Sequence, residues 1–321
     1  MSGPRVLVTG AGGYLGSQLV AALSAGRIDV DAIVAADVRE VPPQQRLPRV
    51  EYARVDVRSP DLLELFERCR SDVVVHLASI VTPGRNSNRQ FEYSVDVQGT
   101  ENVLTACTAT GVKKIVVTSS GAAYGYHPDN PPWITEDWPL RGNEAFAYAH
   151  HKRLVEEMLA RWRTLHPELG QVVFRIGTIL GETVRNQITD LFEKPRLIAV
   201  RGSDSPFVFV WDQDVVACLL RAIETDRTGT YNVAGSGALT IGEIAAKLGK
   251  RCLVLPAGLL RFVLGLLKPL GLTQYGPEQV DFLRYRPVLD NTRLIAEFGY
   301  VPQLTSAQVF DLYLRTHRHG P

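Results

Sequence analysis

Three glycines at a fixed spacing near the start of the chain place the strongest constraint on its fold. Gly10, Gly13 and Gly16 follow the short apolar run 5–8, and helical periodicity begins after Tyr14. In such a strand–loop–helix unit the first glycine permits a tight turn, the second lets the backbone approach a pyrophosphate, and the third lets helix pack closely on strand. The helix N-terminus adds free N–H groups and a positive dipole end. The loop therefore predicts a dinucleotide site made by Gly10, Gly13, Tyr14, Leu15 and Gly16.

The chain continues as an alternation of short apolar runs and helix-like segments. The runs 32–35, 73–75 and 115–117 are rich in β-branched residues, which is typical of strands buried on both faces of a parallel sheet. Helical periodicity between them predicts an α/β fold, a doubly wound parallel sheet with helices on both faces. We expect a dinucleotide-binding domain of residues 1–177 with about 205–235, and a smaller, interrupted substrate-binding lobe of about 178–204 with 236–321.

Composition and charge narrow the range of partners. The 321 residues are 45% hydrophobic and 21% charged, an ordinary globular mix, and the formal net charge of +1 gives no overall attraction to nucleic acid. The four cysteines lie far apart, outside any metal-binding spacing, so we expect a reducing cytoplasm, no disulfide framework and no metal site. An apolar run begins already at residue 5, and no signal peptide is expected. The expected partner is a small-molecule substrate.

The apolar stretch 252–272 is the one candidate for a membrane segment. Pro256 and Pro269 bracket its helical part, which at about 1.5 Å per residue spans roughly 18 Å and is shorter than the ~30 Å hydrocarbon core. We therefore expect no membrane span and a buried or pocket-lining helix, with an interfacial helix as the alternative.

Carboxylates at two predicted strand ends bear on the choice of dinucleotide. Asp37 can accept hydrogen bonds from both ribose hydroxyls of NAD and would repel the 2′-phosphate of NADP. Arg39 would partly offset that repulsion, so NAD is the expected cofactor and NADP is less favoured. Asp56 and Val57 follow the third strand and are expected at the adenine edge.

Tyr148 and Lys152 lie one turn apart on a predicted helix and share a face. A phenol with a pKa near ~10 is a poor base at neutral pH, and the ammonium is expected to lower that pKa. Tyr148 could then take a proton from an alcohol while hydride leaves its carbon. Ser120 follows the predicted strand 115–117, where it could hydrogen-bond the same substrate oxygen.

Over nearly its whole length the chain resembles the extended short-chain dehydrogenase/reductases, the NAD-dependent epimerase/dehydratase-like family. The matching features are the glycine loop, Asp37, His76-Leu77-Ala78, Ser120, Tyr148/Lys152 and the later landmarks 231–233 and 298–302. The resemblance implies that Ser120, Tyr148 and Lys152 are catalytic. It also implies that Leu77, Ala78, Ser119, Tyr148 and Lys152 contact the cofactor, and that two copies pair through the helices carrying Gly99-Thr100 and Tyr148.

The sequence departs from that family at positions that bear on the reaction. Gly121 and Ala122 replace the Asp-Glu pair of the dehydratases, which disfavours elimination of water. Asp96 replaces the usual Asn, which leaves the proton relay open.

Two further departures concern the substrate. Thr178 stands where sugar-nucleotide members have an Asn, and Phe207 lies near the place of a diphosphate-binding Arg; we expect both to face the substrate. The loss of a charged diphosphate contact weakens the sugar-nucleotide interpretation, although Arg201, Arg284 or Arg286 could replace it.

These observations predict an NAD-dependent oxidoreductase that transfers hydride reversibly at a secondary alcohol or ketone carbon. A sugar-nucleotide epimerase that retains its NAD is the alternative, because the same three residues serve both reactions. A non-catalytic NAD-binding regulatory or scaffold protein is less favoured.

Overall fold

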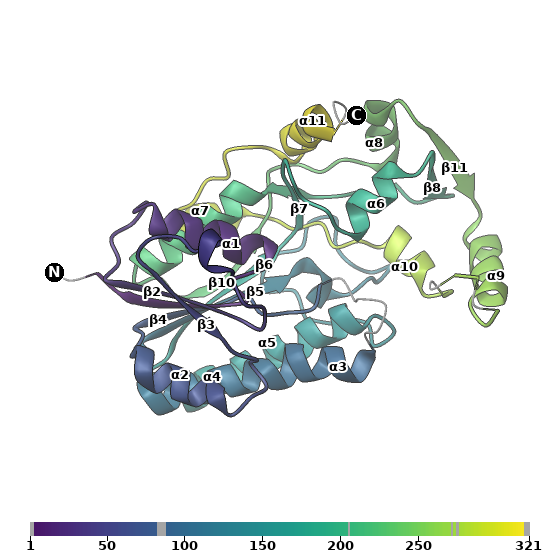
Figure 1. The fold of residues 1–321 in the computed structure, drawn as a ribbon. Coiled ribbons are helices and arrows are strands. Elements are labelled where there is room, and N and C mark those ends of the chain that lie inside the picture. The colour runs from purple at the N-terminus through teal and green to yellow at the C-terminus, as the bar shows by residue number, and fades with distance from the viewer. Residues whose placement is uncertain (1–2, 82–87, 205, 271, 274–275, 318–321) are drawn as a thin grey trace.

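The computed structural model describes residues 3–81, 88–204, 206–270, 272–273 and 276–317. Its centre is a parallel seven-stranded sheet with the strand order β10-β6-β5-β4-β1-β2-β3 (Figure 1). The strands are β1 (Arg5–Thr9), β2 (Ala32–Asp37), β3 (Val50–Arg54), β4 (Val73–His76), β5 (Lys114–Ser120), β6 (Gly170–Ile176) and β10 (Gly229–Val233). The predicted doubly wound α/β fold is confirmed.

Helices cover both faces of this sheet (Figure 1). One face carries α2 (Asp61–Cys69), α4 (Gly99–Thr110) and α5 (Ala147–Leu165), and the other carries α1 (Tyr14–Ser24) and α7 (Asp212–Glu224). Strand alternation divides β1 between the two cores, because Val6 and Val8 pack toward α1 and α7 while Leu7 packs toward α2 and α4. All three side chains are fully buried, which explains why the strands are continuously apolar.

The remaining elements form a smaller layer beside the sheet. Two parallel pairs, β7 (Thr178–Leu180) with β9 (Phe209–Trp211) and β8 (Arg196–Val200) with β11 (Arg251–Leu255), support five helices. These helices are α6 (Gln187–Glu193), α8 (Ile241–Leu248), α9 (Ala257–Leu267), α10 (Gln279–Arg284) and α11 (Ser306–His317). Phe192, Phe207, Phe209 and Phe310 form its aromatic core. The domain boundaries given above stay a prediction.

Short helical turns join these elements. They are η1 (Pro43–Gln45), α3 (Arg89–Tyr93), η2 (Ser94–Gln98), η3 (Gly121–Tyr124) and η4 (Leu294–Phe298). The turn η2 is π-helical and leads directly from α3 into α4.

The structure overturns the expectation that the apolar helix after residue 256 is buried. In α9 only Leu260 is buried, whereas Phe262 and Leu266 are 64% and 52% exposed. The reason is that α9 packs by one side against α10 and β8, and no further layer covers its other side. Within the described part of the chain, no helix combines the length and apolar character needed to span a bilayer.

The register of the sheet brings the predicted site residues to one edge. Thr9 of β1 pairs with Ala36 of β2 and with His76 of β4, and Ser120 ends β5 opposite Ile176. Because all these strands are parallel, their carboxyl ends meet at the same edge, where ligands bind in open α/β sheets.

Backbone crowding explains two of the three spaced glycines. Gly10 has a φ of +69°, and a Cβ there would lie 2.6 Å from the backbone nitrogen of Ala78. A Cβ on Gly16 would lie 2.3 Å from the carbonyl oxygen of Gly10. Neither neighbour is a flexible side-chain end, so a larger residue at either position must displace the β1–α1 turn.

We expect Gly16→Ala to lower the free energy of unfolding by about 1–3 kcal/mol, because the new methyl group overpacks fixed backbone. Urea unfolding followed by circular dichroism measures this change. Gly258→Ala is the matched control, since nothing lies within 4 Å of its added Cβ and it should stabilise α9 by up to about 1 kcal/mol. Equal stability of Gly16→Ala and the unmodified chain would contradict the packing role.

Candidate active site

The carboxylate of Asp37 lies against the glycine loop. Its Oδ2 accepts a hydrogen bond from the Gly12 amide at 2.9 Å, and its Oδ1 accepts from the backbone and side chain of Arg39 at 2.9 and 3.1 Å. Burial alone would raise the pKa of Asp37, but these donors hold the pKa below its usual value. Asp37 is therefore an anionic acceptor beside the loop.

A pocket of about 250 Å³ opens beside this carboxylate. Its lining includes Gly12, Asp37 and Tyr52, together with three arginines, Arg39, Arg46 and Arg54. The adjacent α1 N-terminus has Gly13 as its cap and no side-chain cap bond. A carboxylate for ribose hydroxyls, free helix N–H groups and a glycine-lined turn fit the adenosine and phosphate parts of NAD.

The two residues expected at the adenine edge have different surroundings. Asp56 is partly exposed and held by an ion pair with Arg58 at 2.6 Å. Val57 is buried and packs toward Gly99, whose added Cβ would meet the Val57 side chain at 2.6 Å. The Val57 carbonyl also accepts a hydrogen bond from Asn102 Nδ2 at 3.0 Å, so neither the side chain nor this oxygen is left open for a ligand.

The end of β4 packs on the glycine loop. His76 is buried and bridges Thr9 Oγ1 at 2.7 Å and Thr100 Oγ1 at 3.0 Å. Burial disfavours a charged imidazole and lowers the pKa of His76 to about 3. The Leu77 amide donates to the Thr9 carbonyl, and Ala78 abuts Gly10.

The first residues of α1 reach toward the smaller layer. The Tyr14 hydroxyl donates to Asp212 Oδ2 at 2.6 Å, and burial together with this bond raises the pKa of Tyr14 to about 12. Leu15 packs against the apolar core on the α1 side of the sheet. The side chains of both residues are therefore engaged by other parts of the protein, and a dinucleotide at the loop would meet their backbone.

Ser120, Tyr148 and Lys152 lie together at the carboxyl edge. The Ser120 hydroxyl lies close enough to the Tyr148 hydroxyl to lower its pKa, and Ser120 Oγ accepts a hydrogen bond from the Ala122 amide at 3.1 Å. Lys152 is buried, donates from Nζ to the Thr118 carbonyl at 2.9 Å and lies 5.7 Å from the Tyr148 ring centre. A phenol, a hydroxyl and an ammonium are therefore held within one small volume.

The pKa of Tyr148 differs from the sequence-based expectation. Burial raises the pKa of Tyr148 to about 12; the neighbouring Ser120 hydroxyl opposes this shift, and the charge of Asp96 adds to it. Burial also lowers the pKa of Lys152, against the charges of Asp96 and Glu156. The expected lowering of the phenol pKa is absent because desolvation of the phenolate is the largest influence on this group.

Asp96 is the centre of a buried hydrogen-bond cluster beside these groups. Its Oδ1 accepts from Ser79 Oγ at 3.0 Å and from the Ile80 amide at 2.8 Å, and its Oδ2 lies 3.1 Å from His151 Nδ1. Asp96 thereby ties the loop after β4 to α5, which carries Tyr148. Sequence reasoning singled out Asp96 but missed His151, because nothing in the spacing of 96 and 151 indicates their contact.

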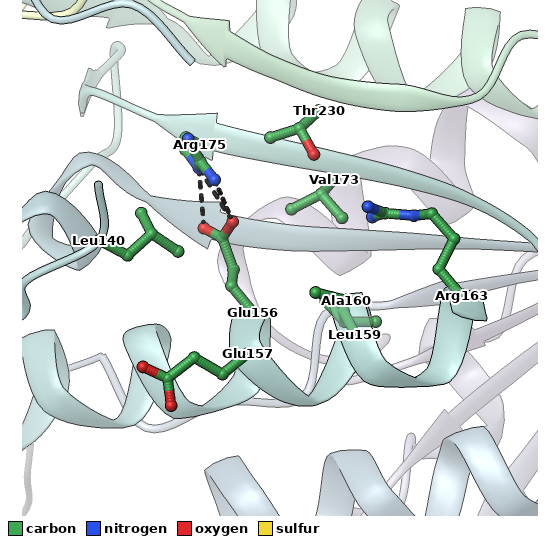
Figure 2. Close-up of a pocket in the computed structure, with 9 residues that line it drawn as sticks. All are labelled: Leu140, Glu156, Glu157, Leu159, Ala160, Arg163, Val173, Arg175 and Thr230. Carbon is green, nitrogen blue, oxygen red and sulfur yellow. Dashed lines mark hydrogen bonds and ion pairs between the residues drawn. The ribbon is translucent and has the colours of Figure 1, made fainter. Parts of the chain in front are cut away.

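A buried ion pair lies one turn beyond Lys152 (Figure 2). Arg175 of β6 pairs with Glu156 of α5 through Nη2 at 2.7 Å and Nε at 2.9 Å, beside a pocket of about 170 Å³. Ser119 also donates to Glu156, and Arg175 Nη1 donates to the Tyr124 hydroxyl at 2.8 Å. The Ser119 side chain thus serves this network, which leaves its backbone for the expected cofactor contact.

Sequence reasoning missed this ion pair as well. A charged residue inside the otherwise apolar strand 170–176 was the available signal. Such a residue is almost never fully buried without a partner.

Aromatic side chains pack around Tyr148. Tyr126, Phe146 and Phe282 cluster with it, with ring centres 5.1 Å apart from Tyr126 to each phenylalanine. The Arg286 guanidinium lies over the Phe282 ring at 4.6 Å, and burial lowers the pKa of Arg286 to about 9. Tyr148 therefore lies beside an apolar wall that contains one arginine.

The two residues predicted to face the substrate differ in accessibility. Thr178 is partly exposed at the start of β7, two residues beyond Ile176, which pairs with Ser120. Phe207 is 1% exposed and belongs to the aromatic core, and Arg286 covers its ring at 3.8 Å. The Phe207 ring therefore contacts Arg286 and the aromatic core and is not open to a substrate.

We expect Arg175→Met to lower the free energy of unfolding by about 3–5 kcal/mol, because it leaves the Glu156 carboxylate buried without its partner. Urea unfolding measures the change, and the double variant Glu156→Leu/Arg175→Met should recover part of it. Arg68→Met is the control: its pair with Glu51 is exposed, and such pairs contribute only about 0–1 kcal/mol. Similar losses for Arg175→Met and Arg68→Met would argue against a structural role of the buried pair.

Comparison with known proteins agrees with this geometry. Residues 6–234 match the NAD dependent epimerase/dehydratase family. A UDP-glucose 4-epimerase of Mycolicibacterium smegmatis is 28% identical over 331 residues, covering 95% of this chain and 95% of that protein. The Mycobacterium tuberculosis protein Rv0501 is 26% identical over 315 residues, with coverages of 97% and 83%.

Solved structures show the same fold. The UDP-glucose 4-epimerase of Thermus thermophilus in complex with NAD has a TM-score of 0.73 at 24% identity, covering 99% of this chain and 100% of that chain. MoeE5 in complex with UDP-glucuronic acid and NAD has a TM-score of 0.72 at 20% identity, with coverages of 98% and 99%. The glycine loop, the strand-end carboxylate and the family match together show that this chain belongs to the NAD dependent epimerase/dehydratase family, whose members are enzymes of the extended short-chain dehydrogenase/reductase type that use NAD.

Proposed function

We propose that this protein transfers hydride reversibly between NAD and a secondary alcohol or ketone carbon, with Tyr148 moving the proton. The observation that carries this proposal is the placement of Tyr148 and Ser120 beside a buried Lys152, whose Nζ lies 5.7 Å from the Tyr148 ring centre. These groups lie at the sheet edge where the glycine loop and Asp37 fit a dinucleotide.

Each of the three residues has a distinct role in this reaction. When bound, NAD supplies the carbon that accepts or returns hydride, and its oxidised ring is positively charged. Ser120 Oγ orients the substrate oxygen, and the Tyr148 oxygen receives the hydroxyl proton as the alcohol is oxidised or returns it to the ketone. The Thr118 carbonyl holds the Lys152 ammonium in place, from where it can favour the phenolate.

Elimination of water has no support at this site. The two positions that carry a carboxyl pair in the dehydratases are Gly121 and Ala122, and Leu289 lies where a Cβ of residue 121 would point. No acid from this segment can therefore protonate a leaving hydroxyl.

Epimerisation of a sugar nucleotide is the second candidate, and Arg286 favours it. A guanidinium flanked by Phe207 and Phe282 can hold an anionic group such as a diphosphate by charge-assisted hydrogen bonds. The similarity to a UDP-glucose 4-epimerase over 95% of both proteins supports the same candidate. In that reaction Tyr148 would take the proton and return it to the same oxygen after the keto intermediate has presented its opposite face, and a bound NAD would supply the hydride chemistry without being released.

We also propose a cytoplasmic homodimer paired through α4 and α5, which the family resemblance suggests. These helices lie side by side on one face of the sheet (Figure 1).

Tyr148→Phe should lower the rate of substrate turnover by about 10²–10⁴-fold and leave the dissociation constant of NAD nearly unchanged, because it removes only the proton-transferring oxygen. Stopped assays of product formation and calorimetric titration with NAD measure the two quantities. Tyr231→Phe is the control, since its hydroxyl donates to the Thr228 carbonyl. Turnover by Tyr148→Phe at the unmodified rate would remove Tyr148 from the mechanism.

The cofactor content of the purified protein separates the two candidates. A dehydrogenase/reductase releases its dinucleotide and changes NADH absorbance with an alcohol or ketone. An epimerase keeps close to one NAD per chain and interconverts UDP-sugars with no net NADH. Turnover of neither sugar nucleotides, steroid-like alcohols nor small hydroxyketones, despite NAD binding, would favour a non-catalytic role.

The raised pKa of Tyr148 makes alcohol oxidation depend on pH. Because the phenolate is the base and its fraction grows as pH rises toward a pKa of about 12, oxidation should accelerate from pH 6 to 9. Asp96→Asn removes a negative charge that raises this pKa, so the rising limb should move to lower pH. Rates measured across that range test both statements.

Asp137→Asn provides the control for this pH profile. Asp137 is an exposed carboxylate that pairs with Arg293 at 2.9 Å. Its loss should leave the rising limb in place. An equal shift in both variants would show that the effect is general and does not come from the Asp96 charge.

A further inference from the structure

Exposed apolar side chains gather in one short part of the chain. Close to half of the large apolar side chains that the structure shows as exposed lie within residues 253–272. Those used below, called the α9 patch, are Leu253, Leu259, Phe262, Val263, Leu266 and Leu270, which are 37–69% exposed. Soluble surfaces rarely expose such a contiguous apolar area without a binding partner.

Helical spacing aligns the α9 patch into a stripe. Leu259, Phe262, Val263 and Leu266 are separated by three, four and seven positions, which places them on one side of α9. The opposite side of the helix, with Leu260 and Leu264, packs on α10 and the β8–β11 pair. Leu260 and Leu264 therefore anchor α9 to the rest of the protein, and the outer stripe makes no part of that core contact.

The position of α9 leaves this stripe accessible. Figure 1 shows α9 at the periphery of the molecule, beyond α10 and below β11, on the side opposite the N-terminal strands. No other described helix lies on its outer side.

A cluster of positive charge adjoins the α9 patch. Arg251 of β11 pairs in register with Arg196 of β8, and strand alternation points Arg251, Leu253 and Leu255 to the same face. Leu255 packs with Leu260 of α9, so the two arginines lie on the α9 side of the pair. Neither arginine forms an ion pair with a carboxylate within the described residues.

The sequence around the α9 patch has an excess of positive charge. No acidic residue occurs between Glu243 and Glu278, while this interval contains Lys247, Lys250, Arg251, Arg261 and Lys268. Arg261 and Lys268 pair with Asp281 and Glu278, which fixes the polar edge of α9 to the α10 side.

We propose that the α9 patch docks on an anionic lipid surface, with the apolar stripe in the interface and Arg196 and Arg251 at the headgroups. An apolar helix face rimmed by cations has the chemistry of an interfacial helix, and α9 lies on the bilayer without crossing it. Pairing of two copies through the same patch would add four arginines to one interface, to which the interval between Glu243 and Glu278 contributes no acidic residue; this disfavours a second copy as the occupant. This inference is independent of the reaction that the protein catalyses.

Vesicle flotation of the purified full-length protein tests the proposal. The protein should float with vesicles of phosphatidylcholine and phosphatidylglycerol and float poorly with phosphatidylcholine alone. Phe262→Gln/Leu266→Gln should weaken binding to the anionic vesicles by at least about tenfold, because it removes two apolar side chains that the lipid would bury. Arg196→Gln/Arg251→Gln should weaken it roughly fivefold for each arginine.

Leu165→Gln/Val301→Gln is the matched control, since these side chains are 70% and 65% exposed on other elements. It should bind vesicles as the unmodified protein does. Calorimetric NAD titration of each variant shows that its fold is intact and separates this test from that of the catalytic proposal.

Two results would overturn the proposal. One is absence of flotation with anionic vesicles, or equal flotation of the Phe262→Gln/Leu266→Gln variant. The other is concentration-dependent self-association in analytical ultracentrifugation that this variant abolishes, without vesicle binding; the α9 patch would then be an interface between two copies.

Discussion

The close contact between the β1–α1 turn and the end of β4 is the constraint on which the site depends. Gly10 adopts a positive φ and touches the backbone at Ala78, and Gly16 lies against the Gly10 carbonyl. This contact aims the α1 N-terminus at the same sheet edge where Asp37 and Ser120 end their strands. The carboxyl ends of the strands lie at one edge because the sheet is parallel. The glycines allow backbone to pack against backbone between the β1–α1 turn and the end of β4, where side chains would not fit.

Burial governs the electrostatics of the reacting groups. Desolvation raises the pKa of Tyr148 and lowers that of Lys152, so both groups are held toward their neutral forms. Asp96 acts on both, because its buried charge supports the ammonium and opposes the phenolate. An Asn at this position would lack that charge and would therefore neither raise the pKa of Tyr148 nor support the Lys152 ammonium in this way.

Sequence reasoning succeeded where the physics is local. The continuous β-branched runs, the spaced glycines and the pair Tyr148/Lys152 depend on residues close in the chain, and their elements form as expected. It failed where partners come from distant segments. His151 meets Asp96 across 55 positions, Arg175 meets Glu156 between a strand and a helix, and nothing in the α9 segment distinguished a buried apolar helix from an exposed one.

By itself the sequence determined the parallel sheet, the phosphate-loop geometry and the residue types available for hydride transfer, because hydrophobic period, glycine spacing and one-turn separations act over a few residues. Only the tertiary structure decided the protonation balance of Tyr148, the position of Arg286 over Phe207 and the exposure of α9. Each of these depends on how much water and which charges remain around a group after distant segments have packed, and that is a property of the assembled fold.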